Sequence, residues 1–303
     1  MDGVLIIDKP AGWTSHDVVA KIRNITRIKK VGHTGTLDPF ATGVLALTLG
    51  RATRLTNYFL ASDKVYRGVM RFGFATTTFD LDGDPVGDVT EPVLDRGQLD
   101  QIFARYTGKV RQTLPPFSAK KVHGKPMYAY ARKGVALEAA TKEIVIKSLK
   151  LLGVSGSEAE FELECSAGTY ARSLAHDIGK DSGCGAHLVR LCRTKSGEFP
   201  IETAASLREG DDFHPREFFL SRIIPMRNLL CELPAIVVSD ADKQRLAHGM
   251  DVNLLTSAPH APEFRLMDEG GDFIALGQRV QAFVSPVAQP AHWVRIHPRI
   301  FFA

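Results

Sequence analysis

The feature that most constrains the fold of this chain is the irregular order of its strand-forming and helix-forming segments. Apolar runs typical of strands occur at 4–7, 44–49, 64–74, 144–154, 158–165 and 188–192. Amphipathic stretches typical of helices occur at 15–25, 51–61, 99–106 and 169–181. Because strands and helices do not alternate strictly, the sequence predicts an α+β fold with a central, largely antiparallel mixed sheet and flanking helices.

A second, smaller unit is expected at the C-terminus. The chain has 303 residues, of which 44% are hydrophobic, enough for one large domain and a small additional one. Residues 206–233 look like a connector. The following 70 or so residues contain short strand-like runs and one helical stretch, which favours a small barrel-like module. We therefore expect one domain over 1–232 and another over 233–303.

Turn-forming residues suggest where several elements begin and end. Ser15 is positioned to cap the first helix, and Gly108 to end the helix that precedes it. Residues 76–92 are polar and rich in turn formers, so we expect an exposed loop there. Residues 127–132 are expected to be helical.

Composition excludes some classes of protein. The formal net charge of +4, with a sequence pI near 8.8, permits a polyanionic partner without requiring one. The four cysteines form no CxxC pair, so neither a zinc site nor a compact disulfide framework is indicated, and no metal is expected.

The start of the chain suggests where the protein works. MDGVLIIDKP has neither a basic segment nor a long apolar core, which argues against a signal peptide. No apolar run approaches the length that spans a bilayer. We expect a soluble, cytoplasmic protein that does not associate with membranes.

One carboxylate is placed where it can do chemistry. Asp38 lies in the segment GHTGTLDPFATG, among glycines and other turn formers, with Pro39 directly after it and a buried strand over 44–49. A lone acid on a rigid loop can act as a nucleophile or as a base. The alternative is a turn aspartate that accepts bonds from backbone N–H groups.

The order of residues around Asp38 resembles the catalytic segment of the TruB family, the bacterial-type tRNA pseudouridine synthases. Other segments resemble further motifs of that family: LIIDKPAGWTSHDVV, DKVYRGVMRFG, PPFSAKKVHGKPMYAYARKG, CSAGTYARSLAHDIG and GCGAHLVRLCRTKSGEF. The resemblance covers residues 1 to about 200. It implies the pseudouridine-synthase fold with a thumb-like insert at about 75–138, and the C-terminal unit more loosely resembles a PUA-type RNA-binding module.

The resemblance implies an isomerase that converts uridine to pseudouridine at position 55, in the TΨC arm of tRNA, after flipping the base out of the RNA. Asp38 would be the nucleophile. The reaction changes no oxidation state and imports no group, so no cofactor is needed. The family resemblance implies tRNA as the partner, no obligatory protein partner, and a monomer.

Five other residues acquire roles from the resemblance. Arg172 would pair with Asp38 and orient it, since a guanidinium can bind both carboxylate oxygens. Tyr66, Tyr170 and Leu191 would form the pocket for the flipped base, and His33 would fill the space that the base leaves. The alternatives are a solvated helix arginine, core packing for the pocket residues, and a histidine that bonds to its own loop.

Basic residues along the polar segments would engage RNA phosphates. Lys9, Arg54, Lys121 and Arg132 are the candidate RNA contacts, although each alone is an ordinary surface charge. Arg54 stands where the family usually has lysine, and Thr77 where it often has aspartate, although Asp80 of the same segment is retained.

Three other functions remain open. The chain could be a guide-RNA-dependent pseudouridine synthase, although the insert at 75–138 favours the stand-alone form. It could be a non-catalytic tRNA-binding or tRNA-folding protein. A hydrolase with an aspartate nucleophile would need a second nearby acid, and the sequence shows none in a comparable loop beside Asp38.

Overall fold

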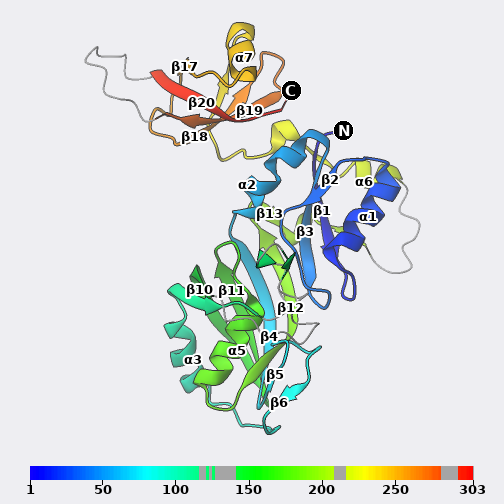
Figure 1. Ribbon diagram of the computed structural model, residues 1–303, viewed down its shortest axis with the longest axis vertical. Coiled ribbons are helices and arrows are strands. Elements are labelled where there is room, and N and C mark those ends of the chain that lie inside the picture. Colours follow the sequence, from blue (N-terminus) through cyan, green and yellow to red (C-terminus); the bar gives the residue numbers. More distant parts are fainter. Residues whose placement is uncertain (116–120, 123–124, 127–140, 208–215, 281–292, 303) are drawn as a thin grey trace.

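The computed structural model describes residues 1–115, 121–122, 125–126, 141–207, 216–280 and 293–302. Within these ranges the chain forms a large mixed sheet and, beyond it, a smaller sheet at one end of an elongated molecule (Figure 1). The α+β prediction with a largely antiparallel mixed sheet is confirmed.

The large sheet has the strand order β14-β1-β3-β12-β4-β11-β10-β7 in the described part of the chain. Its strands are β1 (Gly3–Lys9), β3 (Thr42–Leu49), β4 (Lys64–Phe72), β7 (Gly108–Thr113), β10 (Thr141–Ser155), β11 (Glu158–Cys165), β12 (Ala186–Ser196) and β14 (Ala205–Ser206). Short strands pair at its margins: β2 (Val31–His33) with β3, β13 (Phe199–Pro200) with β12, and β15 (Ile224–Pro225) with β1. Among the described strand pairs of this large sheet, only β1–β14 and β3–β12 are parallel.

Helices cover this sheet at two places. Helices α3 (Arg96–Arg105) and α5 (Ala171–Asp181) lie beside the β4–β11–β10 part, and α1 (Ser15–Thr26) lies beside β1 and β3 (Figure 1). The other short helical segments are η1 (Gly50–Leu55), α2 (Thr56–Leu60), η2 (Ile201–Thr203), α6 (Arg216–Leu220) and η3 (Met226–Asn228). The described residues of this part also form two small two-stranded sheets, β5 (Ala75–Thr76) with β6 (Pro85–Val86) and β8 (Lys121–Val122) with β9 (Lys125–Pro126).

The smaller sheet has the order β16-β18-β19-β20-β17 in the described residues. It consists of β16 (Ala235–Val237), β17 (Val252–Leu255), β18 (Glu263–Met267), β19 (Phe273–Arg279) and β20 (Trp293–Phe301), with helix α7 (Asp240–Ala247) packed beside it. Phe273, Leu276 and Phe302 join a hydrophobic cluster that also contains Val4 and Val44 of the large sheet. The two sheets therefore share a core.

Several local predictions were wrong. Thr14, not Ser15, caps α1: its hydroxyl accepts from the Asp17 N–H, and the Asp17 carboxylate accepts from the Thr14 N–H. The segment expected to be helical over 51–61 starts instead as the 3₁₀ turn η1. Strands β7 and β17 were not foreseen, because their apolar side chains are too few to mark a period. The predicted helix at 127–132 lies outside the described residues.

The expected exposed loop at 76–92 was also only partly right. It contains the β5–β6 hairpin and buries Thr76 and Asp80. Asp80 forms an isolated parallel bridge with Leu188 of β12, which holds the turn against the large sheet. No helix in the described residues is long and apolar enough to cross a membrane.

Candidate active site

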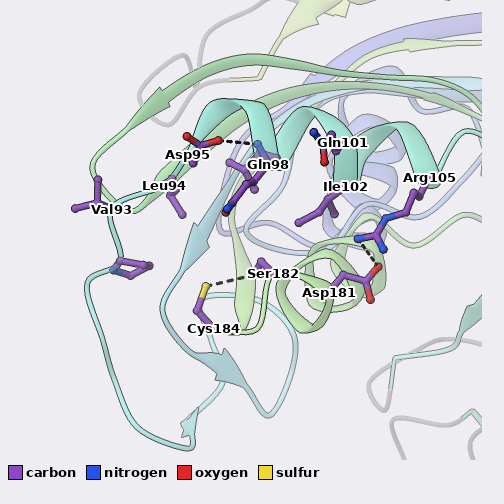
Figure 2. Close-up of a pocket in the computed structure, with 12 residues that line it drawn as sticks. Val93, Leu94, Asp95, Gln98, Gln101, Ile102, Arg105, Asp181, Ser182 and Cys184 are labelled. Carbon is purple, nitrogen blue, oxygen red and sulfur yellow. Dashed lines mark hydrogen bonds and ion pairs between the residues drawn. The ribbon is translucent and has the colours of Figure 1, made fainter.

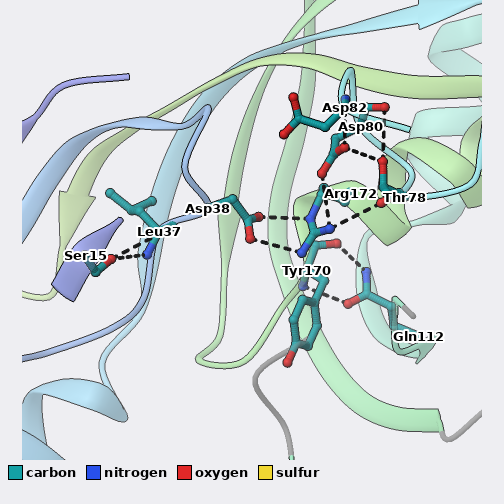
Figure 3. Close-up of polar contacts among 9 residues, drawn as sticks. All are labelled: Ser15, Leu37, Asp38, Thr78, Asp80, Asp82, Gln112, Tyr170 and Arg172. Atoms are coloured by element: carbon teal, nitrogen blue, oxygen red, sulfur yellow. Dashed lines mark hydrogen bonds and ion pairs between the residues drawn. The ribbon is translucent and has the colours of Figure 1, made fainter. Parts of the chain in front are cut away.

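The loop that carries Asp38 meets helix α5 through one ion pair. Nε and Nη2 of Arg172, in the first turn of α5, lie 2.9 Å from Oδ2 and 3.0 Å from Oδ1 of Asp38 (Figure 3). Two guanidinium nitrogens face two carboxylate oxygens, a geometry that fixes orientation as well as charge. Arg172 is buried, but 34% of the Asp38 side chain remains exposed, so the carboxylate is open to a substrate on one side.

A second carboxylate holds Arg172 from the opposite side. Nη1 of Arg172 lies 3.1 Å from Oδ2 of Asp80 and donates to the carbonyl of Thr78 at 3.2 Å (Figure 3). Asp80 is itself fixed, since its Oδ1 accepts from the Asp82 N–H and from the Thr78 hydroxyl. One buried guanidinium therefore joins two carboxylates.

This arrangement corrects the expectation that no second acid lies near Asp38. Asp80 follows Asp38 by 42 positions, in a turn-rich segment whose polarity suggested solvent exposure. It is 4% exposed. The two acids are brought together by elements that lie later in the chain than either: α5, whose Arg172 contacts both, and β12, which pairs with Asp80. Hydrophobic periodicity therefore held no signal for the pair.

The surroundings make Asp38 more basic than an ordinary aspartate. Burial raises the pKa of Asp38 above the usual value of 3.8, the Arg172 charge opposes this shift, and the Asp80 charge adds to it. A more basic carboxylate is a better nucleophile and a better proton acceptor, provided that it is ionised at the working pH.

Ser15 holds the loop from the side of α1. Its hydroxyl accepts from the N–H of Leu37 at 2.9 Å and lies 3.3 Å from the carbonyl of the same residue (Figure 3). Ser15 is buried, so these bonds are shielded from water. The residue expected to cap a helix instead anchors the backbone next to Asp38.

Lys9 anchors the same loop, which corrects its prediction as an RNA contact. Its ammonium is completely buried and donates to the carbonyls of Pro10, Trp13 and Pro39 at 2.6–3.0 Å. A buried charge needs such partners in place of water. Burial lowers the pKa of Lys9 to about 8. Lys9 thus ties the turn after β1 to the residue that follows Asp38.

Arg193 of β12 supports the other side of the loop and was not foreseen as a site residue. It is 1% exposed; its Nε donates to the Val44 carbonyl at 2.7 Å and its Nη2 to the Gly35 carbonyl at 2.9 Å. Gly43 permits the backbone of β12 to lie close to β3 at this point, because its φ is +98° and a Cβ there would lie 2.3 Å from the Arg193 carbonyl oxygen. Only the family-like segment around Arg193 hinted at its importance.

Tyr66 and His33 lie near this centre. Tyr66, on β4, pairs in register with Arg193 and is half-buried. Burial raises the pKa of Tyr66, and the charges of Arg193 and Asp38 act on it in opposite directions. His33 ends β2, and its Nδ1 accepts a long bond from the Gly35 N–H at 3.4 Å, as in the loop-bonding alternative. Its insertion into RNA stays a prediction.

The two remaining pocket candidates are Tyr170, whose backbone is held by hydrogen bonds, and Leu191, which is held by packing. Tyr170 precedes α5, and the side-chain amide of Gln112 bonds to both its N–H and its carbonyl, at 2.8 and 3.0 Å (Figure 3). Leu191 is buried in the cluster that contains Leu37, and Tyr66 packs against the same cluster. The core-packing alternative for Leu191 is therefore true, without excluding contact with a base.

The candidate RNA contacts are dispersed. Arg54 is exposed and donates to the carbonyl of Phe301, which links η1 to the smaller sheet. Lys121 lies in β8, where the structure does not describe side chains, and Arg132 lies outside the described residues. Among the residues that are described, no three histidine, cysteine, aspartate or glutamate side chains gather as a metal site requires.

A separate cavity of about 480 Å³ lies between α3 and the residues after α5 (Figure 2). Its lining includes Val93, Ile102, the Arg105–Asp181 ion pair and Cys184. It contains none of the predicted site residues, so it is not part of the centre around Asp38.

Comparisons of the sequence with known proteins point to one family. The profile described as TruB family pseudouridylate synthase (N terminal domain) matches residues 23–171, and that described as tRNA pseudouridylate synthase B C-terminal domain matches residues 172–226. A Solibacter usitatus protein named tRNA pseudouridine synthase B is 41% identical over 282 residues, which cover 92% of this chain and 96% of that protein. A protein of the same name from Chromobacterium violaceum is 38% identical, over 92% of this chain and 90% of that protein.

A solved structure resembles the whole chain. The crystal structure of a Cbf5-Nop10-Gar1 complex contains a chain with a TM-score of 0.72 and 27% identity, which matches 99% of this chain and 85% of its own length. The two family profiles and the relatives agree with the pairing of Asp38 and Arg172. This chain belongs to the TruB family of pseudouridylate synthases.

Proposed function

We propose that this chain is an isomerase that converts uridine to pseudouridine at position 55 in the TΨC arm of tRNA. The observation that carries this proposal is the partly exposed Asp38 carboxylate held by both edge nitrogens of the buried Arg172. The substrate is inferred from the relatives, which are named tRNA pseudouridine synthase B.

The reaction needs one group that forms a covalent bond and later leaves. After the uridine is flipped out, an oxygen of Asp38 attacks either the base ring or the sugar carbon, and the electron pair of the breaking N-glycosidic bond goes to the base. The base turns, its C5 bonds to the same sugar carbon, and Asp38 is released. C5 of the base loses a proton and the former glycosidic nitrogen gains one, so the product is an isomer of the substrate.

We assign to the surrounding residues the orientation of Asp38 and the binding of the flipped base and the RNA. Arg172, braced by Asp80, would keep Asp38 ionised and oriented while it attacks. Tyr66 and Tyr170 would present planar rings to the flipped base, and Leu191 would wall the pocket. His33 would enter the RNA loop. Arg54, Lys121 and Arg132 remain proposed phosphate contacts.

The domain organisation is part of the same proposal. We assign catalysis to residues 1–232, with a thumb-like insert at about 75–138, and RNA binding to a PUA-like module at 233–303. The described C-terminal residues form a five-stranded sheet of their own, which supports this division, and that sheet also shares a hydrophobic cluster with the large sheet. We propose a monomer that needs no protein partner and works in the cytoplasm, a reducing compartment that suits the four free cysteines.

A guide-RNA-dependent synthase is the second candidate. The likeness to a chain of a Cbf5-Nop10-Gar1 complex, which is an assembly of several proteins, favours it, but identity to that chain is 27%, against 41% to a relative named tRNA pseudouridine synthase B. The purified chain should modify a bare T-arm hairpin. If it acts only after a guide RNA and partner proteins are added, the guide-dependent reading is correct.

The decisive experiment is mass-spectrometric mapping of pseudouridine in T-arm RNA incubated with the pure protein. Wild type should convert the target uridine. Asp38→Asn, which keeps the size of the side chain but removes its charge, should give no product while tRNA binding persists. Product from the variant would remove Asp38 as nucleophile, a non-catalytic binding protein would give no product even from wild type, and release of free uracil would indicate a hydrolase.

A further inference from the structure

A basic cavity lies at the far end of β3 from the Asp38 loop. It has a volume of about 410 Å³ and is formed by the start of the chain, the residues between α1 and β2, the start of η1, and α6. Its charged lining residues are Asp2, Arg27, Lys29, Lys30 and Arg216.

Among the described residues, the positive charges of this cavity have few acidic partners. The acid that lines it in this part of the chain, Asp2, is already engaged, since its Oδ1 accepts from the Arg51 N–H at 2.7 Å and its Oδ2 lies 3.0 Å from the Arg51 Nε. In the described part of the chain, no carboxylate lies within ion-pair distance of Arg27, Lys29 or Lys30, and all three are exposed.

The backbone beneath these cations is held in place. The N–H of Gly50 donates to the carbonyl of Lys30 at 2.9 Å, and β2 starts one residue later by pairing Val31 with Leu49. Arg216 donates to the carbonyl of Thr26 at 3.1 Å, which ties α6 to the end of α1. The cations are therefore presented by a fixed surface.

The position of the cavity relates it to the catalytic loop. Lys30 leads through the three residues of β2 directly to His33. Thr42, just after the Asp38 loop, and Leu49, beside the cavity, stand at opposite ends of β3, about 23 Å apart at the usual rise per residue. The cavity is too far from Asp38 to receive the nucleotide that reacts there, but the same RNA molecule can reach both.

We propose that Arg27, Lys29, Lys30 and Arg216 bind backbone phosphates of the substrate RNA, at a site separate from the pocket for the flipped base. This inference rests on the proposed function, because RNA is the polyanion that the enzyme must hold. Exposed lysines and arginines that neutralise phosphates release counterions, so their contribution falls steeply as salt rises.

The test is tRNA binding by Lys29→Gln/Lys30→Gln, measured over a range of salt concentrations. The structure gives neither ammonium a hydrogen bond or ion pair with another described residue, so the substitution removes charge without removing such a contact. We expect affinity to fall roughly tenfold at moderate salt and the slope of log K against log salt to decrease by about one to two. Turnover at saturating tRNA should stay within about twofold of wild type.

Two matched variants make the result specific. Lys150→Gln/Lys180→Gln removes the same charge from exposed positions on β10 and α5, together with one exposed Lys150–Glu162 ion pair at 3.7 Å, and should bind like wild type. Lys29→Arg/Lys30→Arg keeps the charge and should also bind normally. Wild-type affinity and salt slope in the glutamine variant would overturn the inference, as would an equal loss in the control. Conversion of uridine by wild type tests the proposed function separately.

Discussion

At the scale of single residues, the chemistry depends on how the nitrogens of the Arg172 guanidinium are shared between two carboxylates. Arg172 gives Nε and Nη2 to Asp38 and Nη1 to Asp80 and to the Thr78 carbonyl. A lysine at this position would supply one point charge and could not reproduce the fork. The reactive carboxylate is thus oriented by a cation that is itself fixed.

The shift at Asp38 predicts how activity depends on pH. The raised pKa means that Asp38 takes up a proton at a higher pH than a free aspartate, whose pKa is 3.8. Since only the ionised form can attack, single-turnover rates should fall as the pH falls through this raised value, and should recover above it. The measurement is a pH–rate profile with saturating tRNA. A profile that stays flat down to pH 3.8, in protein that is still folded, would contradict the role of Asp38 or its environment.

At the scale of elements, helix α5 organises the site. Its residues Arg172 and His176 lie one turn apart. Arg172 donates hydrogen bonds to the Asp80 carboxylate and to the Thr78 carbonyl, and the His176 ring stacks on the Phe79 ring with centroids 3.9 Å apart. Phe79 has a positive φ of 66°, an unusual conformation for a residue other than glycine. The helix therefore holds the turn over 78–80 at two points and uses it to brace Arg172.

The substitution Asp80→Asn tests whether Asp80 positions Arg172. The amide can still accept from the Asp82 N–H but carries no charge for Arg172, and a hydrogen bond to a charged group contributes about 1.5–3 kcal/mol. We expect turnover at saturating tRNA to fall roughly 10- to 100-fold while tRNA affinity changes little. Asp82→Asn, in the same turn but exposed, is the matched control and should be nearly neutral. Similar turnover in the two variants would mean that Asp80 does not position Arg172.

At the scale of the whole molecule, the two sheets are joined too closely to act as independent parts. Phe273, Leu276 and Phe302 complete the cluster around Val4 and Val44. Polar contacts cross the same junction: Arg54 donates to the Phe301 carbonyl, and the Tyr58 hydroxyl donates to Glu263 at 3.2 Å. The smaller sheet thus stabilises the sheet that carries the active site.

Deleting residues 234–303 should therefore destabilise the catalytic part as well as weaken RNA binding. Loss of the three apolar side chains opens a buried cluster, which we expect to cost on the order of 3–5 kcal/mol of unfolding free energy. Thermal or denaturant unfolding of the truncated and full-length chains measures the difference. Equal stabilities would show that the junction contributes little, and RNA binding by the truncated form is interpretable only after this comparison.

The sequence by itself determined the fold class, the family resemblance, and the candidates Asp38 and Arg172, because hydrophobic periodicity and motif order are properties of local segments. Only the tertiary structure decided what Asp80, Ser15, Lys9 and Arg193 do. Each of these residues makes its key contact with a segment far away in the sequence or across a sheet, and each looked locally like a loop acid, a helix cap or a surface cation. Burial changes their role, since a polar group removed from water must find partners within the chain, and here those partners belong to the loop around Asp38 or to Arg172.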